Sequence, residues 1–207
     1  MKNGFWGAHD ASVSFCENKY ERYYWIAEYH NTISSLCYVI VGLLIMRTRL
    51  KFLGQLLCGV GIGAGLLHAT LRHWAQMGDE MAMLTLSFYT LKELRPRTSK
   101  YLLYPMLISY CLFSRYFIVF FLTFTGLQLL TAKYAGQKIN VKNKKWILLY
   151  FISFISGLIC WFFDQFCRTS YGGLEPYQFH AWWHFFTSLA IAFGFVALND
   201  SSRSISE

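Results

Sequence analysis

The sequence has few charged residues and none of the segments that usually divide a chain into separate parts. Of its 207 residues, 14% are charged, while 55% are hydrophobic and 19% are aromatic. It contains no internal repeat, no low-complexity tract and no linker between candidate domains. The first 31 residues lack the basic-then-apolar run and the small-residue cleavage site of a signal peptide, so we expect no cleaved leader. The length would suit one modest soluble domain, but the apolar content excludes that class.

Apolar residues are gathered into seven blocks, which we interpret as membrane-spanning helices. The expected spans are Thr32–Met46, Phe52–His73, Met81–Leu91, Tyr101–Phe113, Tyr116–Leu130, Trp146–Phe163 and Phe179–Leu198. Several blocks are shorter than the ~20 residues that cross a bilayer, so we expect their helices to extend into the flanking sequence. The sequence therefore predicts an all-α fold, a seven-transmembrane helix bundle over residues 32–198. Residues 1–31 and 199–207 would form an N-terminal segment and a short C-terminal tail.

Basic residues alternate between the expected loops and predict how the chain is oriented in the membrane. They gather after the first, third and fifth spans, at Arg47, Arg49 and Lys51, then Lys92, Arg95, Arg97 and Lys100, then Lys133, Lys138, Lys142, Lys144 and Lys145. Loops rich in Lys and Arg stay in the cytosol. With seven spans, the N-terminal segment is then lumenal or extracellular, and the tail is cytosolic. The net charge of +8 follows mostly from this topology, an interpretation that we prefer to a nucleic-acid-binding surface.

Two histidines, His180 and His184, stand four residues apart at the head of the last span. Histidine in a hydrocarbon setting needs a partner. Positions i and i+4 share one face of a helix, so the two rings can converge on one point, as a metal-binding pair does. A structural pair that is hydrogen-bonded to neighbouring helices fits the spacing equally well. A third histidine, His68, is expected at the same depth near the lumenal end of the second span, and three histidines leave one zinc position open, as in a catalytic site.

Other polar residues and glycines near His68 have two interpretations each. Asp79 is expected at the start of the third span on the lumenal side, either inside the site or as a helix N-cap after Gly78. His73 is another candidate ligand, although it lies closer to the expected water interface. The alternating glycines of the second span most simply permit close helix packing; they are Gly59, Gly61, Gly63 and Gly65.

Ordered motifs along the chain resemble one family. They are GFWG at Gly4–Gly7, FCENKYERYYWIAEYHNTISS at Phe15–Ser35, HATL and QMGDE between His68 and Glu80, WFFDQFC at Trp161–Cys167, and HAWWH at His180–His184. In this order and spacing, they resemble the motifs of the alkaline ceramidases. This family belongs to a wider group of seven-span membrane hydrolases that includes the adiponectin receptors. The acidic N-terminal segment is similar to the ceramidases and not to the receptors.

The resemblance implies a zinc-dependent membrane amidase. Such an enzyme hydrolyses ceramide, its membrane lipid partner, to sphingosine or a related sphingoid base and a free fatty acid. The family's zinc ligands correspond to His68, His180 and His184, and its general base corresponds to Asp79. The expected location is the endoplasmic reticulum or the Golgi. Because fold alone does not fix the substrate, a related lipid hydrolase and a catalytically silent lipid-binding member remain open alternatives.

The chain departs from the family pattern four residues before the first zinc ligand. The family has a serine there, whose hydroxyl supports the attacking water or the developing oxyanion, and this chain has Ala64. Losing one such donor typically lowers the rate ~10²–10³-fold. The resemblance therefore implies an enzyme in which a water replaces this hydroxyl, or one that is slow or catalytically silent. If the missing hydroxyl limits the reaction, Ala64→Ser should raise turnover.

A second departure affects the N-terminal segment, which the family uses to hold a calcium ion with acidic, amide and backbone oxygens. The corresponding positions are Ser14, Phe15, Glu17, Lys19 and Glu28. Ser14 replaces an expected aspartate and Lys19 an expected asparagine, whereas both glutamates remain. An ammonium group donates hydrogen bonds and cannot coordinate a cation. Calcium binding is therefore doubtful, and we expect an inward-pointing Lys19 to bridge Glu17 and Glu28 in place of the ion.

Two other outcomes are compatible with the same residues. Lys19 could point into solvent, which would leave Glu17 and Glu28 as ordinary surface residues. Alternatively, Asn18 could shift register and replace the missing amide oxygen, so that a weakened calcium site survives.

The resemblance also bears on the six cysteines. Four lie inside expected spans, where cysteine is usually a packing residue; they are Cys37, Cys58, Cys111 and Cys160. Cys16 and Cys167 fall in the expected lumenal segments, where disulfides persist. Both match positions that the family pairs, so the resemblance implies a Cys16–Cys167 disulfide.

Overall fold

The computed structural model describes residues 4–138, 144–167 and 173–203, and its regular elements there are helices. The eight α-helices are α1 (Tyr29–Ser34), α2 (Leu36–Ile45), α3 (Lys51–Thr70), α4 (His73–Leu94), α5 (Leu103–Leu112), α6 (Phe117–Lys138), α7 (Lys144–Cys167) and α8 (Phe179–Arg203). Two short 3₁₀ helices, η1 (Lys100–Leu102) and η3 (Glu175–Tyr177), precede α5 and α8. The all-α prediction is confirmed.

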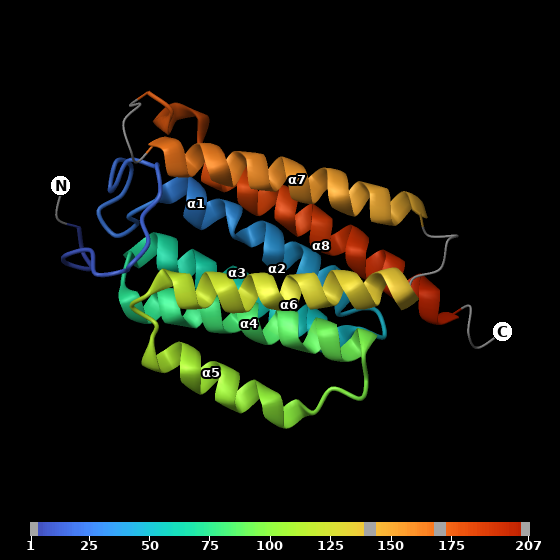
Figure 1. The fold of residues 1–207 in the computed structure, drawn as a ribbon. Coiled ribbons are helices and arrows are strands. Elements are labelled where there is room, and N and C mark those ends of the chain that lie inside the picture. Colours follow the sequence, from blue (N-terminus) through green and yellow to red (C-terminus); the bar gives the residue numbers. More distant parts are fainter. Residues whose placement is uncertain (1–3, 139–143, 168–172, 204–207) are drawn as a thin grey trace.

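The helices run back and forth between two ends of one bundle (Figure 1). Ser35 joins α1 to α2 with helical backbone angles, so these two helices form a single pass, and the described helices make seven passes. The N-terminus lies at one end of the bundle and the C-terminus at the other (Figure 1). The basic residues that follow α2 and α4 lie at the C-terminal end, away from the N-terminal segment.

Four of the described helical stretches are long and apolar enough to cross a membrane: Lys51–Thr70, Phe117–Lys138, Lys144–Phe166 and Glu175–Asp200. The apolar stretch Tyr29–Ile45 is shorter. Helix α5 has 10 residues, and α4 has 22 residues but includes two acidic residues near its middle, Asp79 and Glu80. Length and apolar character therefore identify four candidate spans among the described helices. The other three passes are α1 with α2, α4 and α5. They are recognised by their packing against the other helices of the bundle.

The expected boundary between the second and third spans was wrong. We expected one span to continue to His73 and the next to begin at Met81, whereas α3 ends at Thr70 and His73 begins α4. Leu71 takes a left-handed backbone conformation with φ of 52°. Its carbonyl accepts the N–H groups of Asp10 at 3.3 Å and Ala11 at 3.2 Å. The N-terminal segment, distant in sequence, therefore stabilises the break between the two helices.

Residue Asp10 also fixes the start of α4. Its Oδ1 accepts the backbone N–H of His73 at 2.7 Å, which satisfies one of the free donors of the first helical turn. Its other carboxylate oxygen lies 3.2 Å from the Arg72 guanidinium. Residues of the N-terminal segment thus act as caps for helices of the bundle.

Helices α2 and α3 approach closely through glycines. A Cβ atom at Gly54 would lie 2.6 Å from the carbonyl oxygen of Gly42, and one at Gly61 would lie 2.7 Å from the side chain of Val39. By contrast, a Cβ at Gly59 would meet nothing within 4 Å. Close packing therefore explains some of the glycines of α3 but not all of them.

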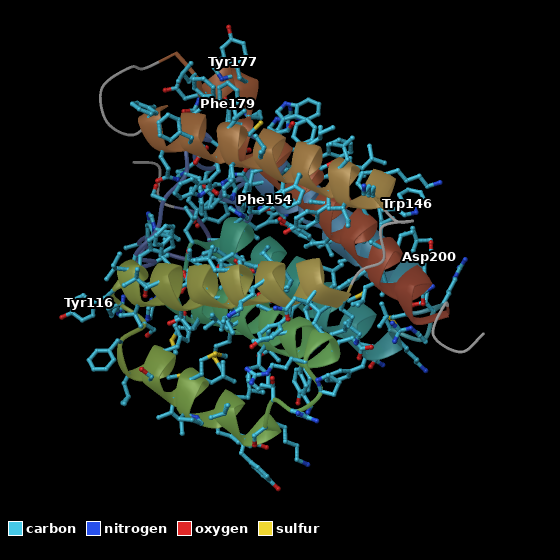
Figure 2. All side chains as sticks on the ribbon, turned by 45° about the vertical axis from the view of Figure 1, so that its right-hand side comes forward. Tyr116, Trp146, Phe154, Tyr177, Phe179 and Asp200 are labelled. Atoms are coloured by element: carbon cyan, nitrogen blue, oxygen red, sulfur yellow. The ribbon has the colours of Figure 1, made fainter. Side chains whose placement is uncertain are left out.

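The buried core lies where α2, α3, α4 and α8 meet, and it includes Leu57 and Phe195. The outer faces of α6 and α7 are apolar but exposed, as Leu129 at 68% and Phe162 at 54% illustrate. Extensive exposed apolar surface of this kind suits hydrocarbon rather than water. Aromatic residues lie near both ends of the bundle: Tyr177, which is exposed, at one end and Trp146, which is half-buried, nearer the other (Figure 2), as in the interfacial belts of membrane proteins.

The close contact between α2 and α3 predicts different effects of alanine at two glycines of one helix. Gly54→Ala should lower the melting temperature, because overpacking against the Gly42 carbonyl costs about 1–3 kcal/mol. Gly59→Ala is the matched control: its Cβ meets open space, and loss of glycine's flexibility should leave stability equal or raise it by about 0.5–1 kcal/mol. Thermal unfolding in detergent micelles measures both, and equal melting temperatures for the two variants would contradict the packing account.

Candidate metal centre

Three buried histidines converge at the end of the bundle that carries the N-terminal segment. His68 comes from the last turns of α3, and His180 and His184 come from the first turns of α8. One ring nitrogen from each lies within 4.8 Å of the others. The ring centroids are 4.7–5.0 Å apart, and none of the three residues is more than 5% exposed. Within the described residues, this is the cluster of side chains that could hold a metal ion.

Each histidine has a polar partner next to its Nδ1 atom. The Glu28 Oε2 lies 2.6 Å from Nδ1 of His68, and the Ser34 Oγ lies 2.8 Å from Nδ1 of His184. Asp164 Oδ2 lies 3.8 Å from Nδ1 of His180, which is beyond direct hydrogen-bond distance. Metal-binding histidines characteristically direct their second nitrogen to a carboxylate or another acceptor. The arrangement leaves the Nε2 atoms for a shared ligand, and three imidazole nitrogens suit zinc.

Backbone pairing brings Glu28 to the histidines. The N–H groups of Ala27 and Glu28 donate to the carbonyls of Ala69 and His68 at 2.9 and 3.0 Å. This short pairing places Glu28 beside the ring of His68, with a fully buried side chain. Asp164 connects a different part of the chain, because its Oδ1 accepts the backbone N–H of Cys16 at 3.1 Å. Both partners therefore depend on the N-terminal segment being in place.

Residue Lys19 points inward. Its ammonium group contacts the Glu28 carboxylate and donates to the Phe15 carbonyl at 2.7 Å. Burial would raise the pKa of Glu28, but the Lys19 charge and the contact with His68 hold that pKa below its usual value, so the carboxyl remains ionised. The interpretation in which Lys19 points into solvent is wrong, because Glu28 is 0% exposed and paired with it.

Glu17 is held differently from what we expected. Its two carboxylate oxygens accept the backbone N–H groups of His30 at 2.7 Å and Asn31 at 2.9 Å, which lie in the first turn of α1. The carboxylate therefore caps that helix and interacts favourably with its dipole. Burial raises the pKa of Glu17, and these two N–H groups act in the opposite direction. Glu17 is buried, so it is not an ordinary surface residue.

Phe15 covers the histidines from the N-terminal side. Its ring centroid lies 4.7 Å from that of His68 and 3.9 Å from that of His180. Because Lys19 binds the Phe15 carbonyl as well as Glu28, one ammonium group holds two neighbours of the histidines. Ser14, the other departure in this segment, is half-buried beside Phe15.

Asp79 lies inside α4, six residues after the start of that helix, so its interpretation as an N-cap is wrong. It is 8% exposed, and its Oδ1 has no hydrogen-bond partner within the described part of the chain. Its backbone packs on α3, because a Cβ at Gly63 would lie 2.8 Å from Cα of Asp79. The neighbouring Ala64 is 3% exposed and offers no side-chain hydrogen-bond donor there.

His73 lies outside the cluster of three histidines. Its Nε2 is 3.1 Å from the Ser114 hydroxyl, near the turn between α5 and α6. It therefore connects helices and is not part of the candidate metal site.

The sequence did not identify the partners of the histidines. Glu28, Ser34 and Asp164 were present in the motifs, but no spacing rule connected them to particular rings. A search for acidic residues in apolar surroundings would have found Asp164, which lies in an otherwise apolar α7 and is 1% exposed. Ser34 has no such signal, because a serine on a helix usually bonds its own backbone.

The cysteines agree with the expected division into free and paired residues as far as they are described. Cys16 is disulfide-bonded, and the four cysteines inside the helices are free: Cys37, Cys58, Cys111 and Cys160. Cys167 is the last residue of α7, and its side chain lies outside the described part of the structure. The Cys16–Cys167 pairing therefore stays a prediction.

Comparisons with known proteins agree with this arrangement. An alkaline ceramidase of Arabidopsis thaliana is 30% identical over 210 residues, which cover 90% of this chain and 82% of the relative. Alkaline ceramidase 3 of Mus musculus is 26% identical over 221 residues, which cover 91% of this chain and 82% of the relative. The model of the family described as Ceramidase matches residues 7–205, a range that contains all three histidines, Asp79 and most of the N-terminal segment. The chain therefore belongs to the ceramidase family.

Proposed function

We propose that this protein is a zinc-dependent membrane amidase that hydrolyses ceramide to a sphingoid base and a free fatty acid. The observation that carries the proposal is the convergence of three oriented, buried histidines in a chain that also buries an aspartate, Asp79, on the adjoining helix. The relatives named as alkaline ceramidases provide the substrate class. Zinc is preferred because the ligand set is three imidazoles, and in two of them, His68 and His184, a polar partner lies within hydrogen-bond distance of the second nitrogen.

The reaction is the hydrolysis of an amide, in which water adds to the carbonyl carbon and the C–N bond breaks. Zinc, when bound, supplies a Lewis acid and lowers the pKa of water to around 7. Asp79 would accept a proton from the attacking water and return it to the nitrogen of the leaving amine. Its unpartnered Oδ1 supports this role, because a base needs a free oxygen that faces the reactants. The products are then a carboxylic acid and a primary amine, and all atoms are accounted for.

The membrane topology that we propose has seven spans, with the histidines near the lumenal side. The seven passes of the described helices support it, as do the basic residues gathered at the opposite end of the bundle. The N-terminal segment would be lumenal and the tail cytosolic, in the membrane of the endoplasmic reticulum or the Golgi. The exposed apolar faces of α6 and α7 suit contact with the two chains of a ceramide in the bilayer.

The alternative is a catalytically silent lipid-binding member that keeps the metal for structure. Ala64 favours it, because this buried methyl group occupies the position of the family's serine. A related hydrolase of another acylated lipid would use the same residues.

The activity is tested with purified protein in detergent and a panel of ceramides and other acylated lipids, with released fatty acid as the readout. We expect hydrolysis of ceramide that is lost when a zinc chelator is added and restored by zinc. Asp79→Asn should lower kcat by about 10²–10⁴-fold, the range of general-base contributions, while zinc content stays unchanged. Hydrolysis of another lipid alone would support the related hydrolase, and no hydrolysis with full zinc content would support the silent member.

The metal is tested by elemental analysis of the same preparations. We expect about one zinc per chain, because the described residues provide one cluster of three imidazoles. His180→Ala and His184→Ala should each remove the metal. His30→Ala is the matched control, because His30 is half-buried outside the cluster, and it should keep the metal. Full zinc occupancy in both cluster variants would refute the assignment.

The inward position of Lys19 predicts that calcium changes neither the activity nor the melting temperature of the unmodified protein. Its ammonium group occupies the space between the Phe15 carbonyl and the Glu28 carboxylate, two oxygens that a cation would otherwise attract. Activity and melting temperature should therefore be indifferent to calcium and to a calcium-selective chelator. The double variant Lys19→Asn with Ser14→Asp should acquire a calcium-dependent rise in melting temperature. A clear rise in the unmodified protein would mean that calcium binds despite the lysine.

A further inference from the structure

A layer of side chains lies one helical turn below the histidines, on the side away from the N-terminal segment. Ala64 precedes His68 by four residues on α3, which runs toward that segment, and Thr187 follows His184 by three residues on α8, which runs away from it (Figure 1). Residues three or four apart lie on one face of a helix, about 5 Å apart along its axis. Ala64 and Thr187 therefore lie at similar depth, directly under the rings. Asp79 reaches the same layer, since its backbone packs on Gly63.

Tyr38 of α2 enters this layer from a third side. It follows Ser34, the partner of His184, by four residues. The edge of its ring meets the ring of His184 with centroids 5.5 Å apart. The hydroxyl group is buried and lies 2.6 Å from Thr187 Oγ1. The layer that lacks a hydroxyl at Ala64 thus contains one from a different helix.

The Tyr38 hydroxyl can turn its hydrogen from Thr187 to another acceptor. Thr187 Oγ1 lies 2.6 Å from the Trp183 carbonyl, so its single hydrogen is directed to that oxygen and it accepts from Tyr38. If the Tyr38 O–H turned to a substrate oxygen, Thr187 could donate to Tyr38 instead. A hydroxyl that receives a hydrogen bond becomes a stronger donor in its turn.

We propose that the Tyr38 hydroxyl donates a hydrogen bond to the amide oxygen as that oxygen becomes negatively charged, in place of a hydroxyl at position 64. The proposal rests on the amidase function proposed above. Tyrosine hydroxyls can serve as oxyanion donors in other enzymes, and a donor in a water-poor site is worth most when the charge develops. Donation of this hydrogen bond breaks no covalent bond, and Tyr38 stays un-ionised throughout. The alternative is that the Tyr38–Thr187 hydrogen bond has only a structural role and joins α2 to α8.

A double-variant cycle separates the two roles. The four proteins are the unmodified chain, Tyr38→Phe, Ala64→Ser and the variant with both changes. Tyr38→Phe should lower kcat by about 10²-fold or more, the usual effect of losing one oxyanion donor, with KM changed less than about threefold. Ala64→Ser should change kcat less than about threefold on its own, because the donor is already present. In the Tyr38→Phe background it should raise kcat at least about tenfold, because the serine hydroxyl replaces the missing one.

A matched control removes another buried hydroxyl. Tyr110 is 1% exposed and donates to Glu80 Oε2 at 2.7 Å, between α5 and α4. Tyr110→Phe should lower the melting temperature, and any loss of activity that follows should not be rescued by Ala64→Ser. Zinc content and melting temperature are measured for every variant, so that a loss of folded protein is separated from a loss of chemistry.

The outcomes are distinct. Rescue by Ala64→Ser that is confined to the Tyr38→Phe background supports the proposal. A Tyr38→Phe variant with kcat within about threefold of the unmodified protein overturns it, as does an equal loss in both backgrounds, which is the signature of a structural role. An unmodified protein without amidase activity contradicts the proposed function and this inference together, whereas activity with an unaffected Tyr38→Phe contradicts this inference alone.

Discussion

The contact between the Glu28 carboxylate and His68 is the interaction on which the rest of the site depends. Glu28 is fully buried, and a buried charge is tolerated only when partners surround it. Lys19, His68 and the Asn31 side-chain amide supply these partners from three parts of the chain. Removing any one of them would leave an incompletely compensated charge inside the protein. The N-terminal segment, the start of α1 and the end of α3 are therefore held together by one carboxylate.

Much of the fold could be predicted from the sequence, because apolar blocks and alternating basic loops have a direct physical cause. The ends of the helices could not, since the break at Leu71 is stabilised by N–H groups of Asp10 and Ala11, about 60 residues away along the chain. Apolar content also failed for the first turns of α4, where Asp79 and Glu80 are buried inside the bundle. Local composition cannot reveal whether a carboxylate faces a neighbouring helix or the bilayer.

The candidate site, like the fold, could be predicted only in part from the sequence. The spacing of His180 and His184 predicted a shared face, the expected depth of the spans added His68 and Asp79, and the resemblance to the ceramidases assigned their roles. Which ring each partner faces was not predictable, because Ser34 and Asp164 come from helices whose rotation no local pattern determines. Lys19 was expected to bridge two carboxylates, whereas it pairs with Glu28, and Glu17 caps α1 instead. A charge pattern indicates that acidic groups need partners, but only the packed chain determines which donor each one receives.

The histidines come from α3 and α8, and this has a consequence for biosynthesis. A membrane protein is made from its N-terminus onward, so His68 is in place long before the last helix emerges from the ribosome. The backbone pairing of Ala27 and Glu28 with the end of α3 can form before the last helix is made. This pairing places the Glu28 carboxylate next to His68 before the other two histidines are present. His180 and His184 arrive with the final helix. A nascent or truncated chain thus lacks two of the three histidines, and the candidate metal site is complete only when the last helix has joined the bundle.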